Sequence, residues 1–219
     1  MNFQQRLQSI KERIEGNLPA DYLKVMHGAT EDLKQSGIQE KVLKPGQKMP
    51  AFNLLNQDQN PIDSQQLLNK GALVITFYRG VWCPYCNADL ANLKKYVTEI
   101  NAAGAKLIAV SPEQPQFLKK ISDMQKLNFD ILHDANNELA AAFGLKFTLP
   151  EDLKVVYHNQ FNIDLTIQHG NSEWALPMPA RFLVNQAGII QYAESEPDYR
   201  NRPDPDELME VMVKVAGSN

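Results

Sequence analysis

Two cysteines, Cys83 and Cys86, are the side chains of this sequence that are best suited to chemistry by type and spacing. They are the only cysteines among the 219 residues, and Pro84 and Tyr85 lie between them. A separation of three positions is close to one helical turn, so the Cα atoms can fall within the ~4.4–6.8 Å that a disulfide tolerates. The pair can therefore exchange between dithiol and disulfide without unfolding the chain around it.

The expected position of Cys83 makes it the nucleophile. The apolar run 72–78 predicts a strand buried on both faces, and Pro84 then falls in the first turn of a helix that continues past Val97. At a helix N-terminus, free N–H groups and the helix dipole stabilise a thiolate and lower its pKa from ~8.5 toward neutrality. A thiolate attacks both peroxides and disulfides. A Cys86 thiol close by would convert a Cys83 sulfenic acid to a disulfide before further oxidation.

Two other uses of the pair compete with redox chemistry. A Cys-x-x-Cys motif can supply half of a structural zinc site, but zinc takes about four ligands. The histidines lack the paired spacing that would complete such a site: His27, His133, His158 and His169. Two buried structural cysteines are the second alternative. We favour redox use because the motif follows a predicted strand and opens a predicted helix, and we expect no metal or other cofactor.

Helices and strands must position the pair, and their pattern changes once along the chain. Apolar residues recur at helical spacing within 1–36, on either side of Pro19, which predicts two consecutive helices. A linker rich in Pro, Gly and Lys follows at 44–50. We therefore expect an N-terminal helical hairpin extension over 1–43 and a main domain over 44–219.

The main domain alternates strands with helices. Predicted strands at 72–78 and 105–110 flank a helix, which makes a βαβ unit, and a short strand is expected at 129–132. The segments 181–185 and 189–193 are typical of a β-hairpin. These patterns predict an α/β fold with a central mixed, mostly parallel sheet flanked by helices.

One segment of the main domain lacks a clear pattern. Residues 146–177 show no clean periodicity, so we expect an insertion of little regular structure before the C-terminal hairpin. Its aromatic residues Tyr157, Phe161 and Trp174 are expected to pack in a small core, and a groove wall is the alternative.

Charge and apolar runs exclude several classes of function. The formal net charge is −4, and no run of five like charges occurs, so neither nucleic acid nor a membrane surface is an expected partner. We find no export signal, and the longest apolar runs are far below the ~18 residues of a membrane span. We therefore expect a cytoplasmic protein, in which disulfides are mostly transient and catalytic.

Residues 77–86, Phe-Tyr-Arg-Gly-Val-Trp-Cys-Pro-Tyr-Cys, resemble the peroxiredoxin-like branch of the alkyl hydroperoxide reductase and thiol-specific antioxidant family. The similarity extends over about 44–215 through further segments: 44–54, 110–113, 142–145, 176–184 and 198–203. The resemblance implies a thioredoxin-like fold and an antioxidant thiol-dependent peroxidase that reduces hydrogen peroxide or organic hydroperoxides. It matches Cys83 to the attacking cysteine and Cys86 to the resolving one.

The same resemblance implies the partners. The substrate would be a peroxide, and the electron donor a thiol such as thioredoxin, glutaredoxin or glutathione. Members of the family often pair into homodimers.

The sequence also departs from the family pattern. Thr76 and Gly80 stand where typical peroxiredoxins carry Pro and Thr or Ser, and Pro179 stands where they carry Arg. A proline there, in the cis form, is similar to thioredoxins, and Cys-Pro-Tyr-Cys is similar to glutaredoxins. A thiol-disulfide oxidoreductase using the same pair is therefore the alternative function. A redox sensor, or a module whose N-terminal hairpin docks a partner, is a third.

Residues around the pair are candidates for supporting roles. Arg79 is the predicted catalytic cation that stabilises the thiolate in place of the missing family residues, and Arg181 is the second candidate. For both arginines a structural role is the alternative. The predicted substrate pocket is formed by Gly80, Trp82, Pro84, Tyr85, Pro179 and Arg181.

Overall fold

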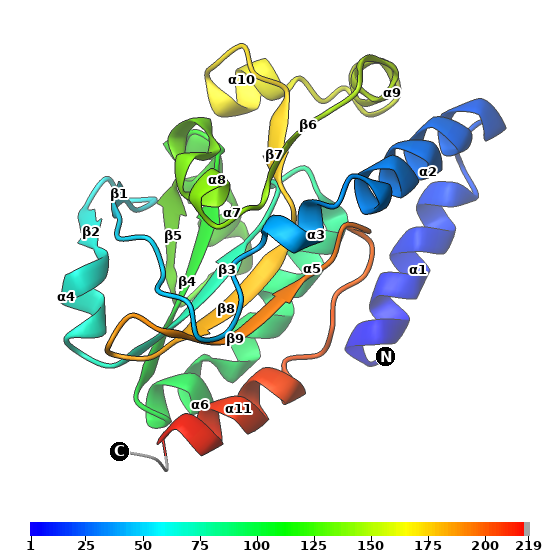
Figure 1. Cartoon of the computed structure of the whole chain (residues 1–219). Helices are drawn as coiled ribbons and strands as arrows, with labels where there is room; N and C mark the ends of the chain where they lie inside the picture. The colour runs from blue at the N-terminus through cyan, green and yellow to red at the C-terminus, as the bar shows by residue number, and fades with distance from the viewer. Residues whose placement is uncertain (217–219) are drawn as a thin grey trace.

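A five-stranded mixed sheet forms the centre of the computed structural model, which describes residues 1–216 (Figure 1). The strand order is β5-β4-β3-β8-β9. Strands β3, β4 and β5 are parallel, whereas β8 pairs antiparallel with β3, and β9 with β8. The bounds are β3 Ala72–Phe77, β4 Ala105–Ser111, β5 Asp130–His133, β8 Ala180–Val184 and β9 Ile190–Ser195. The predicted α/β fold with a mixed central sheet is confirmed.

Strand β3 is buried on both faces, as its continuous apolar run predicts. Leu73, Ile75 and Phe77 point into one apolar core, and Val74 points into the other. Helices cover both faces, so each core lies between the sheet and a helical layer.

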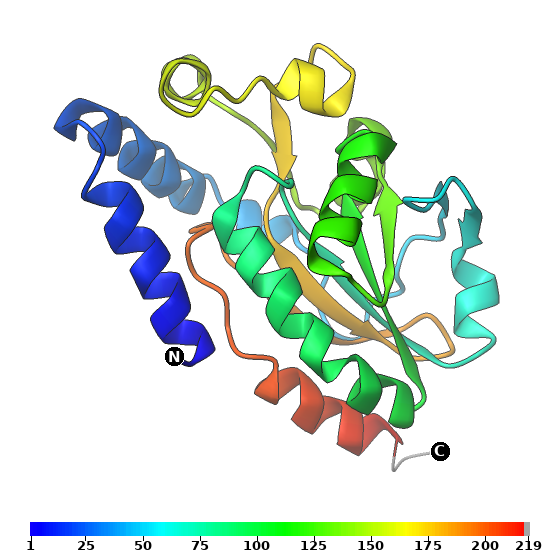
Figure 2. The same cartoon turned by 180° about the vertical axis from the view of Figure 1, so that it is seen from behind.

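The first helical layer carries the segment that follows β3. It consists of α5 Pro84–Leu93, the short 3-10 helix η1 Lys94–Tyr96, α6 Val97–Ala102, α7 Pro115–Gln125 and α11 Asp206–Ala216 (Figure 2). The opposite face is covered by smaller elements, which are α3 Ile38–Lys41, α4 Ser64–Leu68, and η2 Ala135–Asn137 with α8 Glu138–Ala142. A β-hairpin of β1 Asn53–Leu55 and β2 Pro61–Asp63 lies beside β5.

The first 36 residues form the two expected helices, α1 Phe3–Glu15 and α2 Ala20–Gln35. A capping box between Asn2 and Gln5 starts α1. Helix α1 packs on α5 and adds Phe3, Leu7 and Ile10 to the core above the sheet. The N-terminal extension therefore shares a core with the main domain, and the boundary near residue 44 stays a prediction.

The expectation that 146–177 has little regular structure is wrong. This segment contains β6 Lys146–Thr148, α9 Glu151–Phe161, α10 Leu165–His169 and β7 Ala175–Pro177. Strands β6 and β7 pair antiparallel, and α9 buries its apolar side against Met26 of α2. The partner that orders α9 lies more than a hundred residues earlier, so no local periodicity reveals it. Figure 1 shows α9 beside α2, at one end of the molecule.

No helix in the described part of the chain is long and apolar enough to cross a membrane.

Candidate active site

Cys83 and Cys86 lie at the start of α5, after the loop that follows β3. Cys83 is the N-cap residue of α5, and its Sγ accepts a hydrogen bond from the Cys86 backbone N–H at 3.4 Å. Both cysteines are free thiols, and their Sγ atoms are hydrogen-bonded at 2.7 Å. The position at a helix N-terminus agrees with the sequence prediction. Each residue is only 1% exposed.

The two thiols differ in how readily they ionise. Burial alone would raise the pKa of Cys86, but the hydrogen bond with Cys83 and the positive charges of Arg202 and Arg79 lower it to about 6. Burial raises the pKa of Cys83 well above its usual value, and the hydrogen bond with Cys86 adds to the rise. The pair thus loses its first proton easily and its second with difficulty. The lowered pKa expected at Cys83 is therefore a property of the hydrogen-bonded pair, in which Cys86 is the more acidic partner.

Arg202 is the cation whose side chain is hydrogen-bonded to the pair, and the sequence prediction missed it. Its Nη2 donates to Cys86 Sγ at 3.5 Å, and its Nη1 donates to the carbonyl oxygens of Tyr199 and Asn201. Its Nε lies 3.6 Å from Asp89 Oδ2. The segment 198–203 belongs to the family resemblance, which was the available signal.

Arg181, the second candidate cation, lies in the core rather than in the substrate pocket. Its Nη2 donates to Asp89 Oδ1 at 2.8 Å, and its Nη1 lies 3.9 Å from Glu194. Asp89 of α5 therefore bridges Arg181 and Arg202. The guanidinium of Arg181 is paired with the buried carboxylate of Asp89. Arg181 can therefore influence the sulfurs only indirectly, through Asp89.

Arg79 lies beside the pair in a cage of aromatic rings. Its Nη2 donates to the hydroxyl of Tyr157, and its Cζ lies 4.0 Å from the ring centre of Tyr199 and 5.0 Å from that of Trp82. Such cation–π contacts partly replace a counter-ion. Within residues 1–216 no carboxylate pairs with Arg79, and its Nε has no hydrogen-bond partner. Its catalytic role stays a prediction.

A cavity of about 330 Å³ opens beside Cys83. Of the predicted pocket residues, Trp82, Pro84 and Tyr85 line it, as does Arg79. The remaining walls come from the N-terminal helices, the 146–177 segment and the loop after β9, which contribute Arg13, Ile14, Met26, Tyr157, Phe161, Ile163 and Tyr199. Cys83 lines this cavity and Cys86 does not, so Cys83 is the cysteine that a small molecule in the cavity can approach.

Gly80 and Pro179 do not line this cavity, which corrects their predicted role. A Cβ on Gly80 would lie 2.4 Å from Trp82 Nε1 and 2.7 Å from Glu113 Oε1, so the glycine makes room for both side chains. Pro179 is buried, and the structure has no cis peptide bond in the chain that it describes. An X–Pro bond is cis in only ~5% of cases, and the bond before Pro179 takes the common trans form.

Glu113 is a second buried group that sequence reasoning missed. Its side chain is fully buried, and Oε2 accepts from the Val81 N–H at 2.7 Å. Oε1 has no hydrogen-bond partner among the described residues. Burial raises the pKa of this carboxyl to about 8 against the lowering effect of the Val81 hydrogen bond, and the charge of Cys86 adds to the rise.

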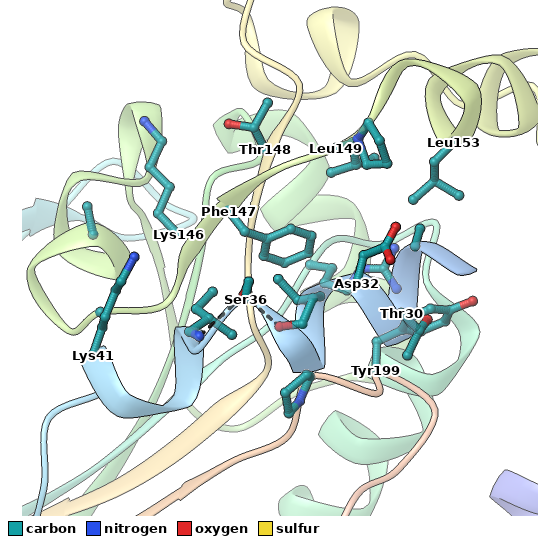
Figure 3. Close-up of a pocket in the computed structure, with 18 of the residues that line it drawn as sticks. Thr30, Asp32, Ser36, Lys41, Lys146, Phe147, Thr148, Leu149, Leu153 and Tyr199 are labelled. Atoms are coloured by element: carbon teal, nitrogen blue, oxygen red, sulfur yellow. Dashed lines mark hydrogen bonds between the residues drawn. The ribbon is translucent and has the colours of Figure 1, made fainter. Parts of the chain in front are cut away.

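A larger cavity of about 970 Å³, drawn in Figure 3, shares part of its wall with the first one. It lies between α2 on one side and β6 with the start of α9 on the other. The two cavities share four residues, which are Met26, Arg79, Tyr157 and Tyr199. Arg79 therefore stands at the border between them.

Metal ligands do not gather in the part of the chain that the structure describes, where no three His, Cys, Asp or Glu side chains come together to hold an ion.

The sequence of this chain matches the model of a known protein family. The model of the AhpC/TSA family matches residues 45–193, more than half of the chain. A bcp protein of Haemophilus influenzae is 29% identical over 103 residues, and peroxiredoxin Bcp of Escherichia coli is 27% identical over 103. Both matches cover 47% of this chain and less than two thirds of the relative's own length, namely 66% and 65%.

Comparison with solved structures gives the fold. Peroxidoxin BcpB of Mycobacterium tuberculosis superposes with a TM-score of 0.62 at 18% identity, covering 79% of this chain and 98% of that one. Peroxiredoxin 6 of Arenicola marina gives a TM-score of 0.63 at 16% identity, with 79% and 73% covered. The predicted thioredoxin-like fold is thereby confirmed.

Proposed function

The chain belongs to the AhpC/TSA family, and from this premise we propose that it is an antioxidant thiol-dependent peroxidase that reduces hydrogen peroxide or organic hydroperoxides. The observation that carries the proposal is the cysteine pair itself. It holds one negative charge above a pKa of about 6, and one of its sulfurs faces a cavity of small-molecule size. A stable thiolate in the wall of a small cavity is what attack on a peroxide oxygen needs.

The first step transfers one oxygen atom to Cys83. The remaining proton of the pair lies between two sulfurs only 2.7 Å apart, so it can rest on Cys86 while the charge resides on Cys83. Cys83 then attacks the peroxide, the O–O bond breaks, and the departing oxygen takes up a proton to leave as alcohol or water. The product on the enzyme is a Cys83 sulfenic acid.

Arg79 is the group placed to assist this attack. It lies in the cavity wall with Cys83, and its positive charge stabilises both the thiolate and the oxygen on which charge develops. Typical peroxiredoxins carry a Thr or Ser hydroxyl at the position of Gly80, and the guanidinium of Arg79 takes its place here.

The second step closes the disulfide. Cys86 attacks the sulfenic sulfur, the S–S bond forms, and its proton leaves with the hydroxide as water. The two sulfurs are already close, so this step requires only a small displacement toward the ~2.05 Å of the bond. An external thiol returns the two electrons.

A thiol-disulfide oxidoreductase acting on proteins is the competing function. Both cysteines are 1% exposed, and the N-terminal helices supply part of the cavity wall around Cys83. A disulfide on a folded protein surface cannot reach them in this arrangement. The burial of the pair therefore favours small peroxides over protein disulfides.

Stopped-flow mixing of the reduced protein with one equivalent of peroxide tests the proposal. The wild-type protein should react far faster than free cysteine and end as an intramolecular disulfide. Cys86→Ser should accumulate a sulfenic acid that dimedone traps, and Cys83→Ser should react like an ordinary thiol. Wild-type protein that reacts no faster than free cysteine would contradict the peroxidase.

The cytoplasm is the compartment that we propose, because a dithiol that must be reduced after each turnover needs a reducing environment. Fractionation of cells that express the full chain tests it. Recovery of the protein with exported proteins would overturn this part of the proposal.

A further inference from the structure

We propose that the oxidised enzyme is reduced by a small thiol that carries a carboxylate, which Arg79 binds, and not by a protein dithiol. The inference rests on the proposed redox cycle of Cys83 and Cys86. It names the electron donor of that cycle by its chemistry.

Access to the disulfide is the first argument. The sulfurs lie 2.7 Å apart in the dithiol, so the disulfide forms without opening the fold and stays as buried as the thiols, each 1% exposed. Arg13 and Ile14 of α1 and Met26 of α2 lie in the wall around Cys83. A protein dithiol would need these helices to move away, whereas a cavity of about 330 Å³ admits a small molecule.

Charge is the second argument. Above a pKa of about 6 the reduced pair carries one negative charge that faces Arg202 and Arg79, and the disulfide carries none. Arg202 has a second anionic partner, Asp89 at 3.6 Å, whose charge does not depend on the redox state of the cysteines. Arg79 keeps only a phenol hydroxyl and aromatic rings, since no described carboxylate pairs with it, and its Nε is buried without a partner. A buried cation without a counter-ion is costly, so the oxidised site favours an anion.

The shape of the site fits a thiol with a carboxylate nearby. Cys83 and Arg79 line the same small cavity, so a donor whose sulfur meets Cys83 can place a carboxylate on the guanidinium. Arg79 also borders the larger cavity of about 970 Å³, which can receive the rest of a longer donor.

The exchange is balanced with two donor molecules. The first donor thiolate attacks the Cys83 sulfur, forms a mixed disulfide and releases Cys86 as a thiolate, which Arg202 stabilises. A second donor thiolate attacks the donor sulfur of the mixed disulfide and releases Cys83. The donor leaves as its own disulfide, two electrons have entered the pair, and the protons of the two donor thiols balance the charge.

The test starts from protein that diamide has oxidised to the disulfide, so its outcome does not depend on peroxide activity. Tryptophan fluorescence follows reduction by mercaptoacetate and by the uncharged mercaptoacetamide, with each rate divided by the concentration of donor thiolate. The ratio of the two rates is divided by the same ratio measured with a small free disulfide, which removes the intrinsic difference in reactivity between the two donors. We expect the wild-type protein to prefer the carboxylate donor by about tenfold or more, the effect of one charge-assisted hydrogen bond.

Variants locate the carboxylate. Arg79→Gln should abolish the preference, and Arg79→Lys, which keeps the charge, should retain most of it. Arg13→Gln removes the other cation in the cavity wall and should leave the ratio unchanged. No preference in the wild-type protein, or a preference lost in Arg13→Gln but kept in Arg79→Gln, would overturn the proposal. So would a reduced Cys-x-x-Cys protein that outpaces mercaptoacetate at equal thiolate concentration.

Discussion

At the scale of single residues, the chemistry depends on buried charges that few counter-ions neutralise. Arg202 and Arg79 face one thiolate, and Asp89 is shared between Arg181 and Arg202. Burying these charges costs desolvation energy, but the excess positive charge keeps the cysteine pair ionised. Each charge should therefore be visible in the titration of the thiols.

Replacing Arg202 tests this most simply. In Arg202→Gln the midpoint of the thiolate absorbance should rise from about 6 by roughly one pH unit or more, because the cation that contacts Cys86 is gone. Arg200→Gln is the matched control, because Arg200 pairs with Asp198 and Glu15 and contacts neither sulfur. A midpoint that moves equally in both variants would show that the effect is not specific to Arg202.

Glu113 should make the folded protein less stable as the pH rises. Its pKa is about 8 in the fold and near 4.5 in the unfolded chain, so the stabilising effect of the protonated form is complete below 4.5 and is lost as the pH rises toward 8. The wild-type free energy of unfolding should fall by about 4 kcal/mol more than that of Glu113→Gln across this range. Urea titrations at several pH values measure it, and parallel pH profiles for the two proteins would contradict it.

At the scale of elements, the N-terminal helices complete the site. Leu7 of α1 is buried in the core that also contains α5, and Met26 of α2 lies in the walls of both cavities. The end of α1 is fastened by Glu15, whose Oε1 accepts from Arg200 Nη1 at 2.8 Å and lies 2.9 Å from His27 Nε2. These helices were predicted from periodicity, but their part in the cavity wall was not, because packing between distant elements leaves no local signal.

Weakening α1 should both destabilise the fold and expose the thiols. Leu7→Ala should lower the free energy of unfolding by about 2–5 kcal/mol, as expected for a buried leucine. It should also speed alkylation of the native thiols by a bulky maleimide. Gln8→Ala, on the exposed side of the same helix, should change stability by less than about 0.5 kcal/mol. An alkylation rate equal to that of the wild-type protein would show that α1 does not guard the pair.

At the scale of the whole molecule, predictability follows the range of the interactions. The central strands and the cysteine motif were predictable because buried runs and a strand-to-helix junction are local patterns. The regular structure of 146–177 was not predictable, because α9 is packed against the distant α2 and β6 pairs with β7. Arg202 contacts a sulfur 116 residues earlier in the chain, a separation that no spacing rule covers.

The most direct test of the account is the rate of the first turnover as a function of pH. Reduced protein is mixed with one equivalent of peroxide, and disulfide formation is followed by mass. We predict a rate that falls as the pH drops through about 6, because the pair then regains its proton. A rate that instead follows the ~8.5 of a free cysteine would contradict the claim that buried arginines hold this pair ionised.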